Sequence, residues 1–304
     1  MAVVIQLTSG HTWNELGDQL TPELLNKMLE DGSATITNLP IKIGDGGTGA
    51  TTATAARDNI GFADKHIEGF TPSFSTASKI LISGGSARNS TDTNNIISAG
   101  SVSADLTVSG ANGLDTGVEA IDTWYAAFVI VDTTGANLPV GLFSTSATAP
   151  TLPSGYDIVR RIGWARNNAA SDIRKFFTFG GDRRRRYVND VVSSEIKALA
   201  GGVATSFTAV SLAAFMPPTS LEVEIRADFE NAGGTDTDTA VFRPTGSAIS
   251  EVNASASIGP GILLTNPMRH MIDLITDSSE SIDYAVTAAA DSLDLYVLGY
   301  TDEV

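Results

Sequence analysis

Three glycines near residue 45 have the spacing of a phosphate-binding loop. Gly44, Gly46 and Gly49 form a G-x-G-x-x-G, which in dinucleotide-binding proteins opens a helix and presents backbone amides to a pyrophosphate. Glu68 lies near the distance at which such sites place an acid for the ribose hydroxyl. The Lys and Ser/Thr that end a P-loop are missing after the last glycine. A nucleotide site also needs repeated strand–helix–strand units, so the surrounding elements decide between this interpretation and others.

The residues suited to acid–base catalysis at neutral pH are few. The chain has three histidines, His11, His66 and His270, and none lies in an H-E-x-x-H or accompanies a G-x-S-x-G. Two carboxylates can cleave a glycan, but the many Asp and Glu residues single out no pair. We therefore expect no enzyme, and keep a glycan-degrading spike as the alternative from another class.

One acidic segment offers oxygen ligands to a cation. Asp228, Glu230, Asp236 and Asp238 lie within "DFENAGGTDTDT". Their spacing is not that of an EF-hand, and the glycines favour a polar hairpin. We expect neither a metal nor a cofactor.

A run of four arginines stands out in an acidic chain. Arg183, Arg184, Arg185 and Arg186 can contact an acidic surface glycan, or can form ion pairs with carboxylates across a subunit contact. The second interpretation is favoured because charge runs are usually solvated.

Four aromatic residues can stack on sugars if they are exposed: Trp124, Tyr125, Tyr156 and Trp164. Their positions within strand-like runs favour places in the core.

Composition limits the partners of the chain. It has 304 residues, with 19 Lys and Arg against 35 Asp and Glu, a formal charge of −16. This charge disfavours nucleic acid and anionic membranes as partners. The chain has no Cys and no run of 18 apolar residues, so we expect a soluble, non-secreted product without disulfides or membrane insertion.

Two short helices are expected near the start, over residues 21–32 and 52–59. In the first, Leu25, Met28 and Leu29 share one face, a stripe too small for an independent core. The first helix must therefore pack against something else.

From about residue 78 the sequence predicts short strands separated by turn residues. The clearest is 219–229, where apolar and charged residues alternate. Further strand-like runs lie at 123–132, 156–164, 174–179, 205–215, 269–277, 281–288 and 292–300. The fold class expected is mainly β, with short N-terminal helices followed by an antiparallel β-sandwich or jelly roll. This context disfavours the nucleotide interpretation of the glycines.

The glycine stretch resembles a known segment of another kind. "GGTGATTATAARDNIG" resembles the G-G-T-G-A-T-T-A-x-x-A-R-x-N-L-G segment of bacteriophage tail fibres and other virion fibre proteins. The resemblance implies a junction between an attachment region and the rest of the fibre, where glycines let several chains approach closely. The residues implied in junction and oligomer packing are Gly46, Gly47, Thr48, Gly49, Ala50, Thr51, Thr52, Arg57 and Asn59.

Two other segments resemble the same class. "LTPELLNKM" resembles a short T-x-x-x-L-N segment near the start of such proteins, which implies N-terminal attachment through Leu25, Asn26, Met28 and Leu29. Residues 155–163 resemble a G-Y-x-x-x-R-R-I-G segment of phage structural proteins, and "LYVLGYTDE" resembles their closing strand.

The resemblance implies a homotrimeric virion fibre, assembled in the host cytoplasm. Residues 1–65 would attach to other virion proteins in the tail, portal or capsid. Residues 66–304 would be displayed, as one domain or as two of about 66–190 and 191–304, and would bind the host surface, with a glycan as one candidate. The alternative within the virion is a capsid head fibre or decoration protein without a receptor role.

Overall fold

A computed structural model of the chain describes residues 4–7, 34–37, 66–179, 184–188, 194–230, 239–248, 252–255 and 268–302. The chain divides into two compact units, Met1–Asp64 and Lys65–Val304. In the first unit, β1 (Val4–Leu7) and β2 (Ala34–Thr37) form an antiparallel pair. The helices expected at 21–32 and 52–59 and the glycine junction lie outside the described residues.

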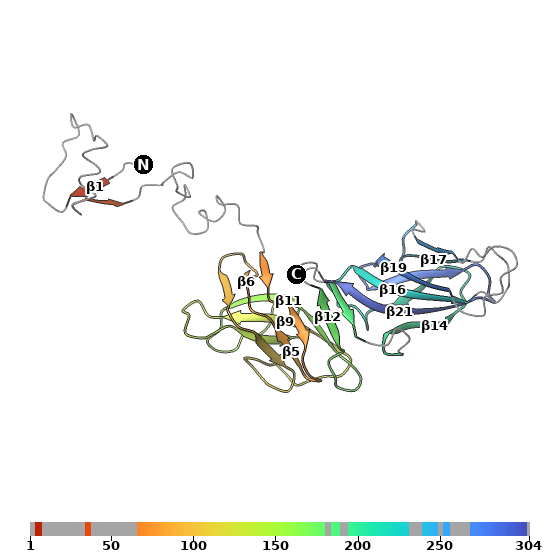
Figure 1. The fold of residues 1–304 in the computed structure, drawn as a ribbon, viewed down its shortest axis with the longest axis horizontal. Coiled ribbons are helices and arrows are strands. Elements are labelled where there is room, and N and C mark those ends of the chain that lie inside the picture. The colour runs from red at the N-terminus through yellow and green to blue at the C-terminus, as the bar shows by residue number, and fades with distance from the viewer. Residues whose placement is uncertain are drawn as a thin grey trace, which may run out of the picture. The chain divides into compact units, whose positions relative to one another are not determined.

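The second unit begins with three small antiparallel sheets (Figure 1). Their strand orders are β3 (Ile67–Gly69), β6 (Gly85–Arg88), β7 (Asn95–Ser98); β4 (Pro72–Phe74), β5 (Lys79–Ile82), β8 (Val102–Asp105); and β10 (Val140–Ser144), β9 (Thr123–Val131), β11 (Ile158–Asn167).

The rest of the second unit contains two larger sheets. The six-stranded sheet has the order β12 (Phe176–Phe179), β13 (Arg184–Tyr187), β21 (Ser292–Thr301), β16 (Glu222–Glu230), β19 (Met268–Ile275), with β14 (Lys197–Gly202) also paired to β21. The four-stranded sheet has the order β15 (Thr208–Ser211), β20 (Ser281–Val286), β17 (Thr239–Pro244), β18 (Val252–Ser255), and a 3-10 turn spans Ser194–Ile196.

The three small sheets form a first group and the two larger sheets a second group. Strand β9 shows how the first group is built. Its sequence TWYAAFVIV is almost continuously apolar because both faces are buried. Tyr125 and Val129 pack in the main core, whereas Ala126 and Phe128 pack in a second cluster with Trp164.

The six-stranded sheet instead follows the alternation seen in its sequence. Val223, Ile225 and Phe229 of β16 are fully buried and share one core with Phe242 and Ile282 of the four-stranded sheet. Two antiparallel sheets with one core between them form a sandwich. The predicted mainly β, antiparallel sandwich class is confirmed, and each of the eight predicted strand regions contains a strand.

Two strands that precede residue 190 belong to the six-stranded sheet and not to the three small sheets. Strands β12 and β13 precede that position, yet β13 pairs with β21, with Arg185 opposite Tyr300. On one edge of β21, β14 pairs with the N-terminal half only. The C-terminal half of that edge would be left without hydrogen-bond partners, and β13 pairs with it. Residues 176–187 therefore belong structurally with the C-terminal sheets.

Candidate functional site

The arginine run forms strand β13, which lies between β12 and β21. Successive residues of a strand point to opposite faces, so Arg185 points one way and Arg184 and Arg186 the other. Arg184 pairs with Asp273 at 3.0 Å and Arg186 with Glu224 at 3.4 Å, both within the chain and both partly exposed. Arg183 lies outside the described residues.

Arg185 is buried, with only 1% of its surface exposed. Its Nη1 donates to Thr178 Oγ1 at 3.1 Å and its Nη2 donates to the Ile162 carbonyl at 3.2 Å. Its guanidinium also lies over the ring of Phe176, 5.1 Å from the centroid. This arginine holds β13 against β11 and offers no surface to a glycan.

Gly163 makes room for the Arg185 guanidinium. Gly163 follows a β-bulge in β11 and has φ +147°, which favours glycine. A Cβ at this position would lie 1.8 Å from Arg185 Nη2. The R-R-I-G segment and the arginine run, separate in the sequence, therefore meet at one contact.

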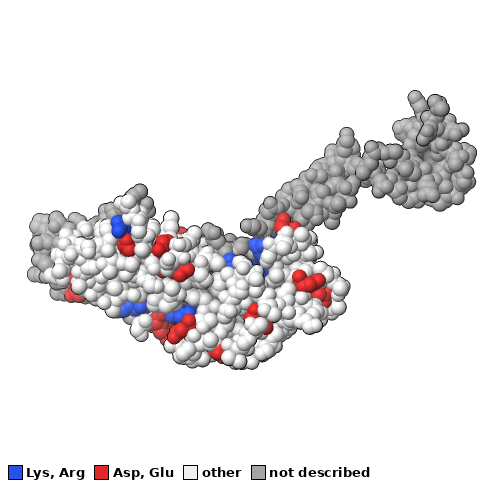
Figure 2. Space-filling model, turned by 180° about the vertical axis from the view of Figure 1, so that it is seen from behind, with Lys and Arg blue, Asp and Glu red and all other residues white. Residues whose placement is uncertain are grey.

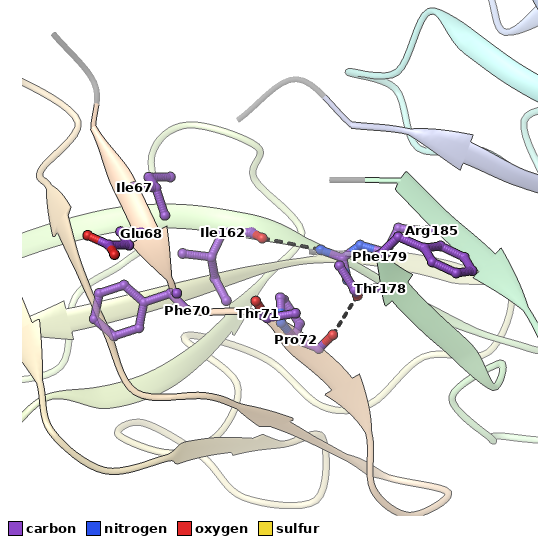
Figure 3. Close-up of a pocket in the computed structure, with 10 residues that line it drawn as sticks. Ile67, Glu68, Phe70, Thr71, Pro72, Ile162, Thr178, Phe179 and Arg185 are labelled. Carbon is purple, nitrogen blue, oxygen red and sulfur yellow. Dashed lines mark hydrogen bonds between the residues drawn. The ribbon is translucent and has the colours of Figure 1, made fainter. Parts of the chain in front are cut away.

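A pocket of about 250 Å³ lies beside this contact (Figure 3). It is lined by Ile67, Glu68, Gly69, Phe70, Thr71, Pro72, Ile162, Thr178, Phe179 and Arg185. Figure 3 shows Glu68 and Arg185 at opposite ends of this lining, with Thr178 donating to the Pro72 carbonyl at 2.6 Å. Because the guanidinium is already engaged and the carboxylate lies apart from it, the lining offers no acid–base pair.

A buried polar cluster joins β11 to the end of β21. Arg161 Nη1 donates to both oxygens of Asp302, at 2.9 and 3.1 Å, and the Asp302 side chain is fully buried. Thr219 Oγ1 donates to Asp302 at 3.0 Å and accepts from Trp164 Nε1 at 2.9 Å. The Thr219 hydroxyl is thus fixed by hydrogen bonds and serves to connect the two groups of sheets.

A second contact between these groups is aromatic. The Arg174 guanidinium lies 5.1 Å from the ring centroid of Tyr187 and 5.2 Å from that of Phe215, and donates to the Ala214 carbonyl. Tyr187 donates its hydroxyl to the Phe215 carbonyl. Burial raises the pKa of Tyr187 to about 12, and it also raises the pKa of Tyr300.

Trp124 extends this contact. Its Nε1 donates to the Ala213 carbonyl at 2.8 Å, and its ring meets Tyr300 edge to face. Tyr125 and Trp164 are buried, as the core interpretation predicted, while Trp124 and Tyr156 are partly buried.

The candidate catalytic and metal residues are not brought together in the described part of the chain. His66 lies 3.9 Å from Glu68, with the His66 side chain partly exposed and the Glu68 side chain largely exposed. Asp228 is paired with Arg226 on the same strand. No group of three or more His, Cys, Asp and Glu side chains in the described residues is arranged to hold a metal ion. Asp236, Asp238 and the side chain of His270 lie outside the described residues.

The described surface is weakly charged on the face drawn in Figure 2. Its Lys and Arg side chains form small patches, several of them beside Asp or Glu, in a largely uncharged surface. Among the described residues no helix has the length and apolarity needed to cross a membrane.

Comparison with known proteins identifies no family for this chain. No protein family profile and no curated protein sequence matches the chain. Among solved structures, the infectious bursal disease virus VP2 subviral particle is similar over 79% of this chain and 73% of that chain, with 13% identity and a TM-score of 0.22. A likeness with so low a TM-score carries no argument about this chain.

Proposed function

We propose that the chain is a structural fibre protein of a bacteriophage virion, without enzymatic activity. The observation that carries the proposal is the segment from Gly46 to Gly61, which resembles the junction of virion fibre proteins and precedes a separate, compact β unit beginning at Lys65. A short junction followed by a β-rich unit is the organisation that this resemblance implies.

The second unit has properties that suit display. The paired strands described in it are antiparallel, its main core includes residues of both groups of sheets, and the buried Arg161–Asp302 pair and the Trp124–Tyr300 contact join these groups. Rigid β units of this kind position surface loops well. In this proposal residues 65–304 face the host surface, with a surface glycan as one candidate receptor.

Attachment and assembly complete the proposal. Residues 1–64 bind another virion protein, with Leu25, Asn26, Met28 and Leu29 in the contact, and Gly46 and Gly49 pack against the same residues of two further chains. The homotrimer forms in the host cytoplasm and is then part of the particle.

Particles assembled without this chain provide the test. The purified full chain, mixed with such particles, is expected to co-sediment with them, whereas a chain lacking residues 1–64 is expected to stay in the supernatant. Equal co-sedimentation of the two proteins would assign attachment to the β unit and contradict the proposal.

Each alternative function predicts a different experimental result. Labelled chain on the capsid, combined with no binding to host cells, would favour a head fibre or decoration protein. Release of oligosaccharides from host polysaccharide would identify a glycan-degrading spike, whereas an adhesin binds the polysaccharide and leaves it intact.

A further inference from the structure

The outer face of the six-stranded sheet carries its side chains in two lateral rows. Cross-strand register aligns the first row as Phe179, Arg184, Thr301, Glu222 and Ile275, from β12 to β19. The second row, aligned in the same way, is Phe177, Arg186, Gly299, Glu224 and Asp273. One side of the face is therefore aromatic and cationic, and the other side is acidic and aliphatic.

Both edges of this face expose large apolar side chains. On β12, Phe177 and Phe179 are 59% and 48% exposed, and on β19, Met271 and Ile275 are 60% and 63% exposed. These residues alternate with inward-facing Phe176 and Leu274, so they share the outer face and are not part of the core. Apolar residues on two edge strands are a liability unless another surface covers them.

The charges between these edges allow the face to be covered. Arg184 pairs with Asp273 and Arg186 with Glu224, across the small residues Gly299 and Thr301 of β21. Because each arginine already has a carboxylate within the chain, packing another surface here leaves no arginine of this face without an opposite charge. Glu222 adds one further negative charge to the acidic side.

The two sides of the face are complementary to each other. The exposed Phe177 and Phe179 on one side can pack against Met271 and Ile275 of a second copy, while the ion pairs stay within each chain. A contact between two different patches of the same chain is heterologous. Heterologous contacts close into a ring when the rotation between copies is an integral fraction of a turn. A second copy of this chain is therefore the occupant that the face itself specifies.

We propose that this face is a subunit interface, in which the β12–β13 side of one chain packs against the β16–β19 side of the next and three copies close a ring. The inference rests on the homotrimer of the proposed function and names the surface that forms it. It places Phe179 of each chain near Ile275 of its neighbour.

Cysteine cross-linking of the full chain tests this contact, because the native sequence has no Cys. The double variant F179C/I275C is treated with a short bis-maleimide and analysed on a denaturing gel. Within one chain these positions are four strand spacings apart, about 19 Å, so a short linker joins only different chains. Both side chains are exposed, so the substitutions leave the core intact.

The proposal predicts covalent trimers from the double variant. It predicts few cross-links from F179C or I275C alone, since a heterologous contact does not bring identical positions together. The matched control is L138C/I275C, in which Leu138 is 80% exposed and lies between β9 and β10, away from this sheet; it is expected to give no covalent trimer.

Failure of this interface and failure of the homotrimer give different results. A native mass of three chains with no more cross-linking than the control would overturn this interface and leave the homotrimer standing. Strong cross-linking of either single variant would replace the ring with an isologous contact. A native mass of one chain would overturn both the interface and the homotrimer.

Discussion

At the scale of single residues, the contact between Gly163 and Arg185 depends on the absence of one carbon atom. Gly163 has a positive φ, and Arg185 Nη2 occupies the space of the missing Cβ. The guanidinium in turn donates to the Ile162 carbonyl. Any side chain at position 163 must strain the backbone and displace a buried cation.

The substitution Gly163→Ala is therefore expected to lower the free energy of unfolding by about 2–4 kcal/mol, from backbone strain and loss of the arginine contact. Denaturant unfolding of the full chain measures it. Gly100→Ala is the matched control, because no atom lies within 4 Å of a Cβ there and φ is not positive; it is expected to change stability by less than about 1 kcal/mol. Equal losses in the two variants would contradict this account of Gly163.

The ion pairs Arg161–Asp302 and Arg184–Asp273 differ in burial, so we expect them to differ in their contribution to stability. Asp302→Asn removes a fully buried negative charge beside a guanidinium, which is expected to cost about 3 kcal/mol of unfolding free energy. Asp273→Asn breaks the exposed pair with Arg184 and is expected to cost less than about 1 kcal/mol. Thermal melts of the two variants side by side check this, and a larger loss in Asp273→Asn would refute it.

At the scale of elements, strand β13 joins the sheets through its alternating sides. Arg185 and Tyr187 face inward, and Arg184 and Arg186 face outward. The buried Tyr187 hydroxyl must stay protonated in the folded chain, because burial raises its pKa from 10.0 to about 12.

This shift makes stability fall at alkaline pH. The unfolded chain releases the Tyr187 proton near pH 10, whereas the folded chain keeps it until about pH 12, so the contribution is complete below pH 10 and is lost between these values. The expected loss from this group is about 2–3 kcal/mol. Tyr187→Phe is expected to flatten that part of the pH profile measured by denaturant unfolding. An unchanged profile would show that Tyr187 does not titrate this way.

Much at this scale could be predicted from the sequence. Alternation in 219–229 and the apolar run at 123–132 predicted β16 and β9, because strand periodicity reports which faces are buried. The position of β13 could not be predicted, since hydrogen bonding to β21 joins residues more than 100 apart in sequence.

The candidate site was harder to predict than the strands. The arginine run and the R-R-I-G segment were both visible, but nothing in their spacing shows that Arg185 packs on Gly163. The signal that existed was the glycine within a strand, which often marks close approach of another group. The exposed apolar edges depend on strand order and needed the sheet itself.

At the scale of the whole molecule, the two groups of sheets in the second unit share a core and are linked by side-chain contacts. Its buried residues form a continuous main core, and Arg161–Asp302 and Trp124–Ala213 join its two groups of sheets. Links between sheets couple the stability of the sheets that they join, and the Arg161–Asp302 pair is the buried one of these two.

Calorimetry of the full chain is expected to show residues 65–304 unfolding in a single transition. Two well-separated transitions within this unit would mean that the links between the sheets are weak. Asp302→Asn is expected to move the whole transition, while Asp273→Asn leaves it nearly in place.

For the whole molecule we propose a trimeric structural component of a phage particle. The most direct measurement is electron microscopy of purified particles that carry the chain with a gold-labelled C-terminal tag. Gold is expected on the particle appendages, in clusters of up to three labels. Purified particles without gold, from cells in which the tagged chain is expressed and folded, would contradict it.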